Sequence, residues 1–172
     1  DLEEFAIHEC IHFIQEVKDK KNNLVKMGLC DYTGIKSSGL GLNEAAVQLM
    51  ASIATGAQKD GVKYYNMELS TESPDYYPIL TALLNEMIYF TGSYPLFHST
   101  LYSNDVFKNT FALKSSYKVY AEIEKNFDLI LSYETLLSQE VARLAEFSND
   151  VDNISYIKKI NSRIDLFNIR NI

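Results

Sequence analysis

The pentapeptide His8-Glu9-Cys10-Ile11-His12 is the feature that most limits how this chain can fold. Residues four apart share one face of an α-helix, so on a helix both imidazoles can reach a single metal ion. Glu9 then stands beside that ion, where its carboxylate can act on water. We therefore expect a helix that presents His8 and His12 as metal ligands and Glu9 as a general base.

A hydrolytic zinc site usually has three protein ligands and keeps its fourth position for water. The segment Leu42-Asn43-Glu44-Ala45-Ala46 places a carboxylate in the first turn of the next expected helix, and its alanines allow that helix to approach the first one closely. We therefore expect Glu44 as the third ligand of a Zn²⁺ ion. Two alternatives remain open: Glu86, in mid-helix among bulky neighbours, and Glu16, which is better suited to a salt bridge.

The hydrophobic pattern predicts a mainly α protein with at most a small β element. We expect helices over 2–20, 42–55, 75–91, 105–131, 134–147 and 150–168, the fourth and fifth possibly continuous. The intervening segments are predicted as a loop with a short strand (20–41), a polar connector (56–74) and a turn (92–95). At 172 residues the chain predicts one domain, divided into metal-binding helices (1–57), a connector (58–74) and a helical subdomain (75–172).

Charge and hydropathy exclude two classes of partner. The formal net charge of -7 has the wrong sign for gripping a phosphate backbone, so we expect no nucleic acid. No apolar run approaches the roughly 18 residues of a membrane span. No signal peptide is evident, which slightly favours the cytoplasm, and a start without Met inside a helical pattern predicts a fragment that lacks an upstream region. The two cysteines are predicted to be buried thiols.

The motif His8-Glu9-Cys10-Ile11-His12 followed by Leu42-Asn43-Glu44-Ala45-Ala46 resembles the gluzincins, the thermolysin-like branch of the zinc metallopeptidases, and in particular their small bacterial members. The resemblance covers about residues 5–51. It implies zincin-like metal helices packed with a C-terminal helical subdomain, and a peptide or protein as substrate. By this resemblance His8, His12 and Glu44 bind zinc and Glu9 is the general base.

The same resemblance gives roles to two neighbours of the ligands. Asn43 is expected to tie the two metal helices together through backbone hydrogen bonds. Gln48 lies where similar enzymes often carry an acid that accepts a hydrogen bond from a ligand imidazole. An amide raises the basicity of that imidazole less than a carboxylate does. The sheet that usually precedes the metal helices in such enzymes is absent from this sequence.

Peptide hydrolysis also needs a hydrogen-bond donor for the oxyanion. His98 is the only other histidine of the chain, and we expect it, or failing it a tyrosine, across a cleft from the metal helices. The candidate tyrosines lie in the connector, just after Pro74, or close to His98: Tyr64, Tyr65, Tyr76, Tyr77, Tyr89 and Tyr94.

Other chemistries fit the sequence less well. A ferritin-like di-iron site needs a second E-x-x-H element, which is missing, and Cys10 falls on the helix face opposite the histidines. The sequence therefore predicts a zinc metallopeptidase. The alternative is a helical regulatory or interaction module, catalytically weak or inactive, that retains a structural zinc site.

Overall fold

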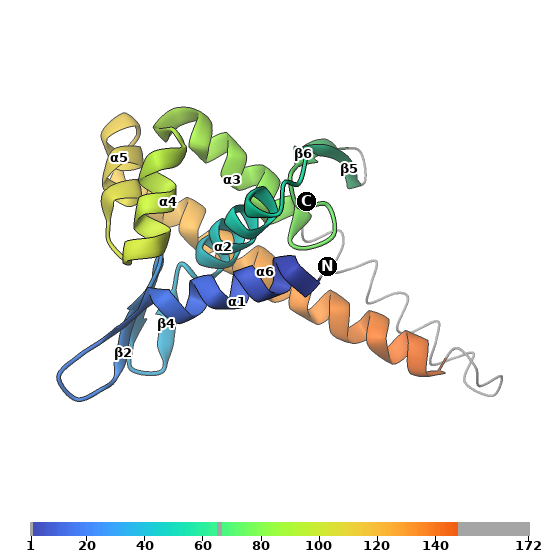
Figure 1. Ribbon diagram of the computed structural model, residues 1–172, viewed down its shortest axis with the longest axis horizontal. Coiled ribbons are helices and arrows are strands. Elements are labelled where there is room, and N and C mark those ends of the chain that lie inside the picture. Colours follow the sequence, from blue (N-terminus) through green and yellow to red (C-terminus); the bar gives the residue numbers. More distant parts are fainter. Residues whose placement is uncertain (1, 65–66, 148–172) are drawn as a thin grey trace. The chain divides into compact units, whose positions relative to one another are not determined.

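The computed structural model of the protein describes residues 2–64 and 67–147 (Figure 1). The helices in these ranges are α1 (Leu2–Gln15), α2 (Leu40–Ala54), α3 (Pro78–Thr91), α4 (Ser93–Tyr102), α5 (Val106–Lys114) and α6 (Tyr117–Phe147). The strands are β1 (Glu16–Lys18), β2 (Leu24–Met27), β3 (Cys30–Thr33), β4 (Lys36–Ser38), β5 (Asp60–Tyr64) and β6 (Met67–Thr71). The predicted mainly α class is confirmed, although the β content exceeds the small element that was expected.

The chain forms two compact units, residues 1–128 and 129–172, and their boundary falls within α6. The predicted connector, 58–74, lies inside the first unit and does not separate the two. The first unit contains α1 to α5, both sheets and the start of α6. In the second unit the described residues, 129–147, are all helical.

Helix α1 ends at Gln15, five residues before its predicted end. The next three residues pair with β2 as strand β1, with Glu16 opposite Met27, so a sheet takes over where we expected helix. The Ser103 hydroxyl donates to the Gln15 carbonyl at 2.5 Å and satisfies one acceptor that the helix end leaves without a partner.

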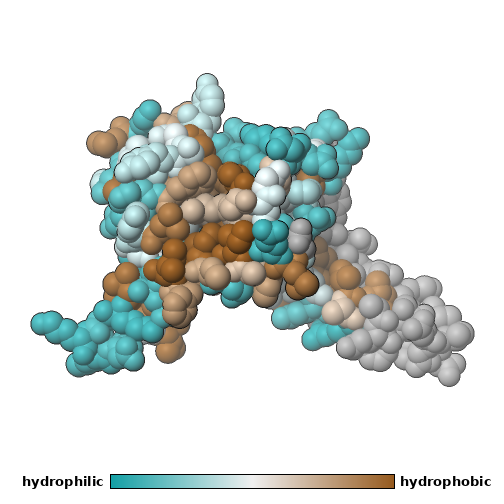
Figure 2. All heavy atoms as spheres, in the orientation of Figure 1, coloured by the Kyte–Doolittle hydropathy of each residue, from teal (hydrophilic) through white to brown (hydrophobic). Residues whose placement is uncertain are grey.

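One face of α1 carries large apolar side chains that are open to solvent. Leu2 is 88% exposed and Phe13 is 82% exposed, and Phe5 and Ile14 are also exposed. Figure 2, in the orientation of Figure 1, shows hydrophobic surface along the path of α1. The opposite face packs against α2, with His8, Ile11 and Gln15 buried.

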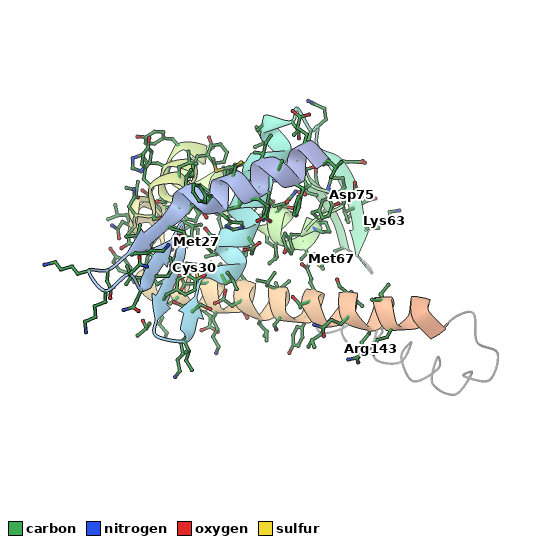
Figure 3. The ribbon with its side chains drawn as sticks, turned by 60° about the horizontal axis from the view of Figure 1, so that its bottom comes forward. Met27, Cys30, Lys63, Met67, Asp75 and Arg143 are labelled. Atoms are coloured by element: carbon green, nitrogen blue, oxygen red, sulfur yellow. The ribbon has the colours of Figure 1, made fainter. Side chains whose placement is uncertain are left out.

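The segment predicted as a loop with one short strand, 20–41, provides three strands of a four-stranded antiparallel sheet with the order β1-β2-β3-β4. Met27 of β2 pairs with Cys30 of β3 across a tight turn (Figure 3). Gly28 in this turn has φ +58°, and a Cβ atom there would lie 2.0 Å from the Asn43 Oδ1 atom. Only glycine therefore fits at this position.

A carboxylate from α6 holds the first turn of α2. The backbone N–H groups of Gly39 and Gly41 donate to the two carboxylate oxygens of Asp128, at 2.9 and 2.7 Å. A Cβ atom on Gly41 would lie 2.3 Å from the carbonyl oxygen of Phe127, so the missing side chain lets α6 pass directly against α2. Helix α2 packs against α1, α3 and α4 and forms the centre of the first unit.

The predicted polar connector contains a β-hairpin, in which Asp60 of β5 pairs with Thr71 of β6. Before α3, Tyr77 adopts a left-handed conformation with φ 51°, and Pro78 takes the first helical position. The predicted turn at 92–95 is wrong, because α4 already begins at Ser93. A helix tolerates a proline in its first turn, where the missing N–H would have no intrahelical partner.

The predicted helix over 105–131 is interrupted at Ser115 and Ser116, between α5 and α6. The Ser116 hydroxyl oxygen accepts from the Val119 N–H at 3.1 Å, which marks the start of the new helix. Helix α6 then continues unbroken to Phe147, so the two predicted helices are continuous here. The predicted helix over 150–168 lies outside the described residues. None of the helices described is long and apolar enough to cross a membrane.

Candidate metal centre

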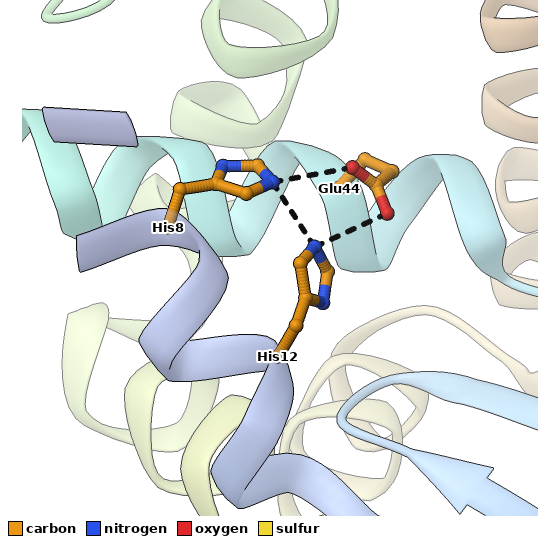
Figure 4. Close-up of side chains that lie close together, drawn as sticks. All are labelled: His8, His12 and Glu44. Carbon is orange, nitrogen blue, oxygen red and sulfur yellow. Dashed lines mark hydrogen bonds and ion pairs between the residues drawn. The ribbon is translucent and has the colours of Figure 1, made fainter. Parts of the chain in front are cut away.

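His8 and His12, one turn apart on α1, meet Glu44 of α2 (Figure 4). The two Nε2 atoms lie 3.0 Å apart. The Glu44 carboxylate oxygens lie 3.5 Å from the His8 Nε2 atom and 3.4 Å from the His12 Nε2 atom. Tetrahedral zinc, with bonds near 2.0–2.2 Å, would set its ligand atoms about 3.4 Å apart. The three side chains therefore fit a single ion.

The hydrogen bonds behind the imidazoles fix which nitrogen of each ring carries hydrogen. The Nδ1 atom of His8 lies 2.9 Å from the Gln48 Oε1 atom, and that of His12 lies 3.2 Å from the Gln15 Oε1 atom. Each amide nitrogen points at a group that can only accept: the Glu4 carboxylate for Gln48, and the Thr100 carbonyl for Gln15. Both amide oxygens therefore face the rings, and both Nδ1 atoms must donate.

A neutral imidazole that carries its hydrogen on Nδ1 has a lone pair on Nε2. Both Nε2 lone pairs consequently point into the space in front of Glu44, where they repel each other unless a cation lies between them. Three electron-pair donors therefore converge on one point, as a metal ion requires, so the residues present fit a bound ion. The predicted clustering of His8, His12 and Glu44 is found.

The electrostatics of the cluster also favour a cation. Burial opposes ionisation of Glu44, but the neighbouring His12 and His8 side chains outweigh burial and lower the pKa of its carboxyl to about 2. Burial by itself would lower the pKa of His12, yet the nearby Glu44 carboxylate, with smaller contributions from Gln15 and Glu9, raises that pKa above its ordinary value. Glu44 is therefore negatively charged at neutral pH, which attracts a cation.

A buried pair of amides anchors the centre from behind. Asn43 Nδ2 donates to the Gln15 Oε1 atom at 3.2 Å, and Asn43 Oδ1 accepts from the Leu29 backbone N–H at 3.0 Å. Asn43 therefore connects α2 to the end of α1 and to the turn between β2 and β3. Its link to α1 runs through the Gln15 side chain, whereas we expected a backbone hydrogen bond.

The ligands lie on the wall of an open pocket of about 350 Å³. Glu9 contributes to the same wall with an exposed side chain. No hydrogen bond or ion pair joins its carboxylate to any other residue in 2–64 and 67–147, so it is available to a bound molecule. Tyr76 and Tyr77 also line this pocket and come from the segment just before α3.

His98 is not among the residues that line this pocket, so the structure does not bring it to the metal centre. It lies on α4 between the rings of Tyr94 and Tyr102, and its Nδ1 atom is 3.1 Å from the Asn104 side chain. Of the candidate tyrosines, Tyr76 and Tyr77 are among the residues that line it. Tyr65 lies outside the described residues.

The alternative third ligands are elsewhere. Glu16 pairs with Lys18 at 2.5 Å within β1, and Glu86 is exposed on α3. Cys30 is buried, as predicted, but Cys10 is exposed, because α1 turns that face to solvent.

Sequence reasoning overlooked Glu4 and Gln15. Both could have been found from spacing, since Glu4 lies four residues before His8 and Gln15 lies three after His12.

Comparison of the chain with protein-family models, with curated proteins and with solved structures finds no match.

Proposed function

We propose that the protein is a zinc-dependent peptidase in which His8, His12 and Glu44 hold the ion. The observation that carries this proposal is the convergence of two imidazole lone pairs and one carboxylate on the wall of a pocket that also presents the Glu9 carboxylate. Two imidazoles and one carboxylate are a donor set that suits catalytic zinc, which leaves a further position open for water.

Zinc bound to this donor set would act as a Lewis acid that makes water more acidic and polarises a carbonyl group. Glu9 can accept a proton from water at its carboxylate and return it to the departing amine. The hydroxyl groups of Tyr76 and Tyr77 are the candidates for binding the substrate carbonyl. Gln48 and Gln15 keep the two ligand rings oriented throughout.

The lining of the pocket suggests which peptides it accepts. Within the described part of the chain no lysine or arginine contributes to the lining, whereas Glu4, Glu9 and Glu44 do. Phe5 and Tyr76 are 61% and 50% exposed and offer aromatic surface beside them. We therefore expect peptides with apolar or basic side chains near the scissile bond to be cleaved faster than acidic ones, and added salt should reduce that difference.

The test combines metal analysis of the purified protein with a peptide-hydrolysis assay. One zinc per chain and measurable turnover are expected. Glu9→Gln should keep the metal and lower kcat about 10²- to 10⁴-fold, because it removes the base and leaves the ligands in place. Glu3→Gln is the matched control: it removes the same charge from α1 at an exposed position outside the pocket, and should leave both readouts unchanged.

Two results would contradict the proposal. Loss of zinc in Glu9→Gln would make Glu9 a ligand. One zinc per chain without hydrolysis of any peptide in a broad library would instead support a regulatory or interaction module with a structural zinc site.

A further inference from the structure

The Gln48 amide connects a metal ligand to a carboxylate. Its Oε1 atom accepts from the His8 Nδ1 atom at 2.9 Å, and its Nε2 atom donates to the Glu4 carboxylate at 2.6 Å. Gln48 is 4% exposed, so water does not compete effectively for these bonds. The Glu4 carboxylate, one turn before His8 on α1, is thereby linked through α2 to a ligand on its own helix.

Two serine hydroxyls complete this network. The Ser52 hydroxyl donates to the Glu4 carboxylate, and the Ser73 hydroxyl donates to the Tyr76 carbonyl at 2.7 Å. Each hydroxyl hydrogen is therefore already used, and both oxygens can only accept from the Gln48 Nε2 atom, at 3.3 and 3.1 Å. Every neighbour of that nitrogen is an acceptor, which leaves the amide a single orientation.

We propose that Glu4 is a positioning residue of the metal centre, whose carboxylate acts through the Gln48 amide to hold His8 in the tautomer that binds metal. This inference rests on the proposed function only in that the centre binds zinc. The negative charge also polarises the amide, which strengthens its bond with His8 and makes the imidazole a better ligand. Gln48 thus transmits the effect of the Glu4 carboxylate to His8.

Removing the Glu4 charge loosens this arrangement in a specific way. In Glu4→Gln a neutral amide oxygen replaces the carboxylate oxygen that accepts from both the Gln48 Nε2 atom and the Ser52 hydroxyl, and it is the weaker acceptor. The Ser52 hydroxyl is then held less firmly and can turn to donate to the Gln48 oxygen. The amide can then turn its nitrogen toward His8, which favours the tautomer with hydrogen on Nε2. That tautomer has no lone pair to offer a metal ion.

The first experiment measures the zinc dissociation constant by competition with a chromophoric chelator. Glu4→Gln, which keeps the shape of the side chain, should weaken zinc binding about 10- to 100-fold, as is usual when a partner of a ligand is lost. Glu3→Gln, its neighbour in the same helical turn, should bind zinc as the wild type does. An unchanged constant in Glu4→Gln, or an equal loss in both variants, would overturn the proposal.

The second experiment separates this role from a merely structural one. Gln48→Glu should also weaken zinc binding, because its new carboxylate lies against that of Glu4. The double variant Glu4→Gln/Gln48→Glu places one carboxylate directly beside His8 and should bind zinc more tightly than either single variant. A structural role for Glu4 predicts a double variant no better than the worse single one, and that result would refute the inference. Gln48→Glu alone keeps the test valid if Glu4→Gln does not fold.

The two proposals can fail separately. A wild-type protein that binds no zinc would end the proposed function, and this inference with it. A wild type that binds zinc and hydrolyses peptides, with zinc affinity insensitive to Glu4, would leave the function standing and remove only the role of Glu4.

Discussion

Gln15 connects several parts of the metal centre, although it is not a ligand. It is 1% exposed, accepts from His12 and from Asn43, and donates to the Thr100 carbonyl. One side chain therefore orients a ligand and ties α1 to α2 and α4. Such a residue is costly to replace, because each polar group that it leaves behind is buried.

We predict that Gln15→Leu lowers both stability and zinc affinity. The apolar side chain fills a similar volume but removes the hydrogen bonds that Gln15 makes with the Asn43 Nδ2 group and the Thr100 carbonyl, at about 1–3 kcal/mol for each buried group. Urea unfolding without zinc measures the stability, and chelator competition measures the affinity. Gln58→Leu, at an exposed loop position, is the control. Unchanged unfolding in Gln15→Leu would show that its hydrogen bonds contribute little.

The two cysteines should differ sharply in reactivity. Cys30 is 0% exposed, and burial raises the pKa of its thiol to about 11, whereas Cys10 is exposed on α1. The reactive form is the thiolate, so we expect one fast-reacting thiol in the native protein at pH 8 and two after denaturation. Counting labels by mass spectrometry checks this, and Cys10→Ser should abolish the fast reaction. Two fast thiols in the native wild type would contradict it.

At the scale of elements, the start of α2 decides where Glu44 lies. Gly41→Ala should cost about 1–3 kcal/mol, because the new methyl group meets the Phe127 backbone, which cannot give way as a side chain would. Zinc affinity should fall as well, since α2 must shift and carries Glu44 with it. Chemical unfolding and chelator competition measure the two effects.

Gly61→Ala is the matched control for this change. A Cβ atom on Gly61, in strand β5, would meet nothing within 4 Å, so its effect should remain within about 0.5 kcal/mol. An equally small loss of stability in Gly41→Ala would contradict the prediction, because it would mean that the Phe127 backbone can move away from α2.

The elements that the sequence predicted best are those with strong helical periodicity. Both ligand helices were predicted correctly over the residues that form the site, because His8, His12 and Glu44 belong to helical patterns with clear spacing. The bounds were less accurate: α1 ends five residues before its predicted end, and α2 begins two residues before its predicted start. Of the four-stranded sheet between them, only one short strand was predicted. Its strands have only three or four residues, and most of their side chains are exposed, so no alternation of apolar and polar residues marks them.

The oxyanion donor could not be placed from the sequence for a different reason. Which side chain lies across from the ligands depends on how α3 and its preceding loop pack, and no local pattern encodes that. His98 was expected there because its residue type suits the chemistry. Its ring packs between two tyrosines of its own helix instead.

For the molecule as a whole, the centre joins the first helix of the chain to the most buried one. Zinc that binds the folded state alone should therefore stabilise it by about 4 kcal/mol at a thousand times its dissociation constant. For the unit of residues 1–128 this corresponds to a rise in Tm of about 15 °C.

Thermal unfolding with zinc and with excess chelator measures this effect. Glu44→Gln, which removes a ligand, should unfold at one temperature under both conditions. A wild-type Tm that does not respond to zinc would mean that the ion does not bind the folded state at the site.

In the sequence, all four strands of the first sheet fall between α1 and α2, the helices that carry the ligands. None of these strands supplies a ligand or an amide that orients one. The length of chain between His12 and Glu44 is therefore free to vary during evolution, provided that the turn at Gly28 still fits against Asn43. A search for other chains built in this way should use two short blocks, E-x-x-x-H-E-x-x-H-x-x-Q and N-E-x-x-x-Q, and leave the gap between them open.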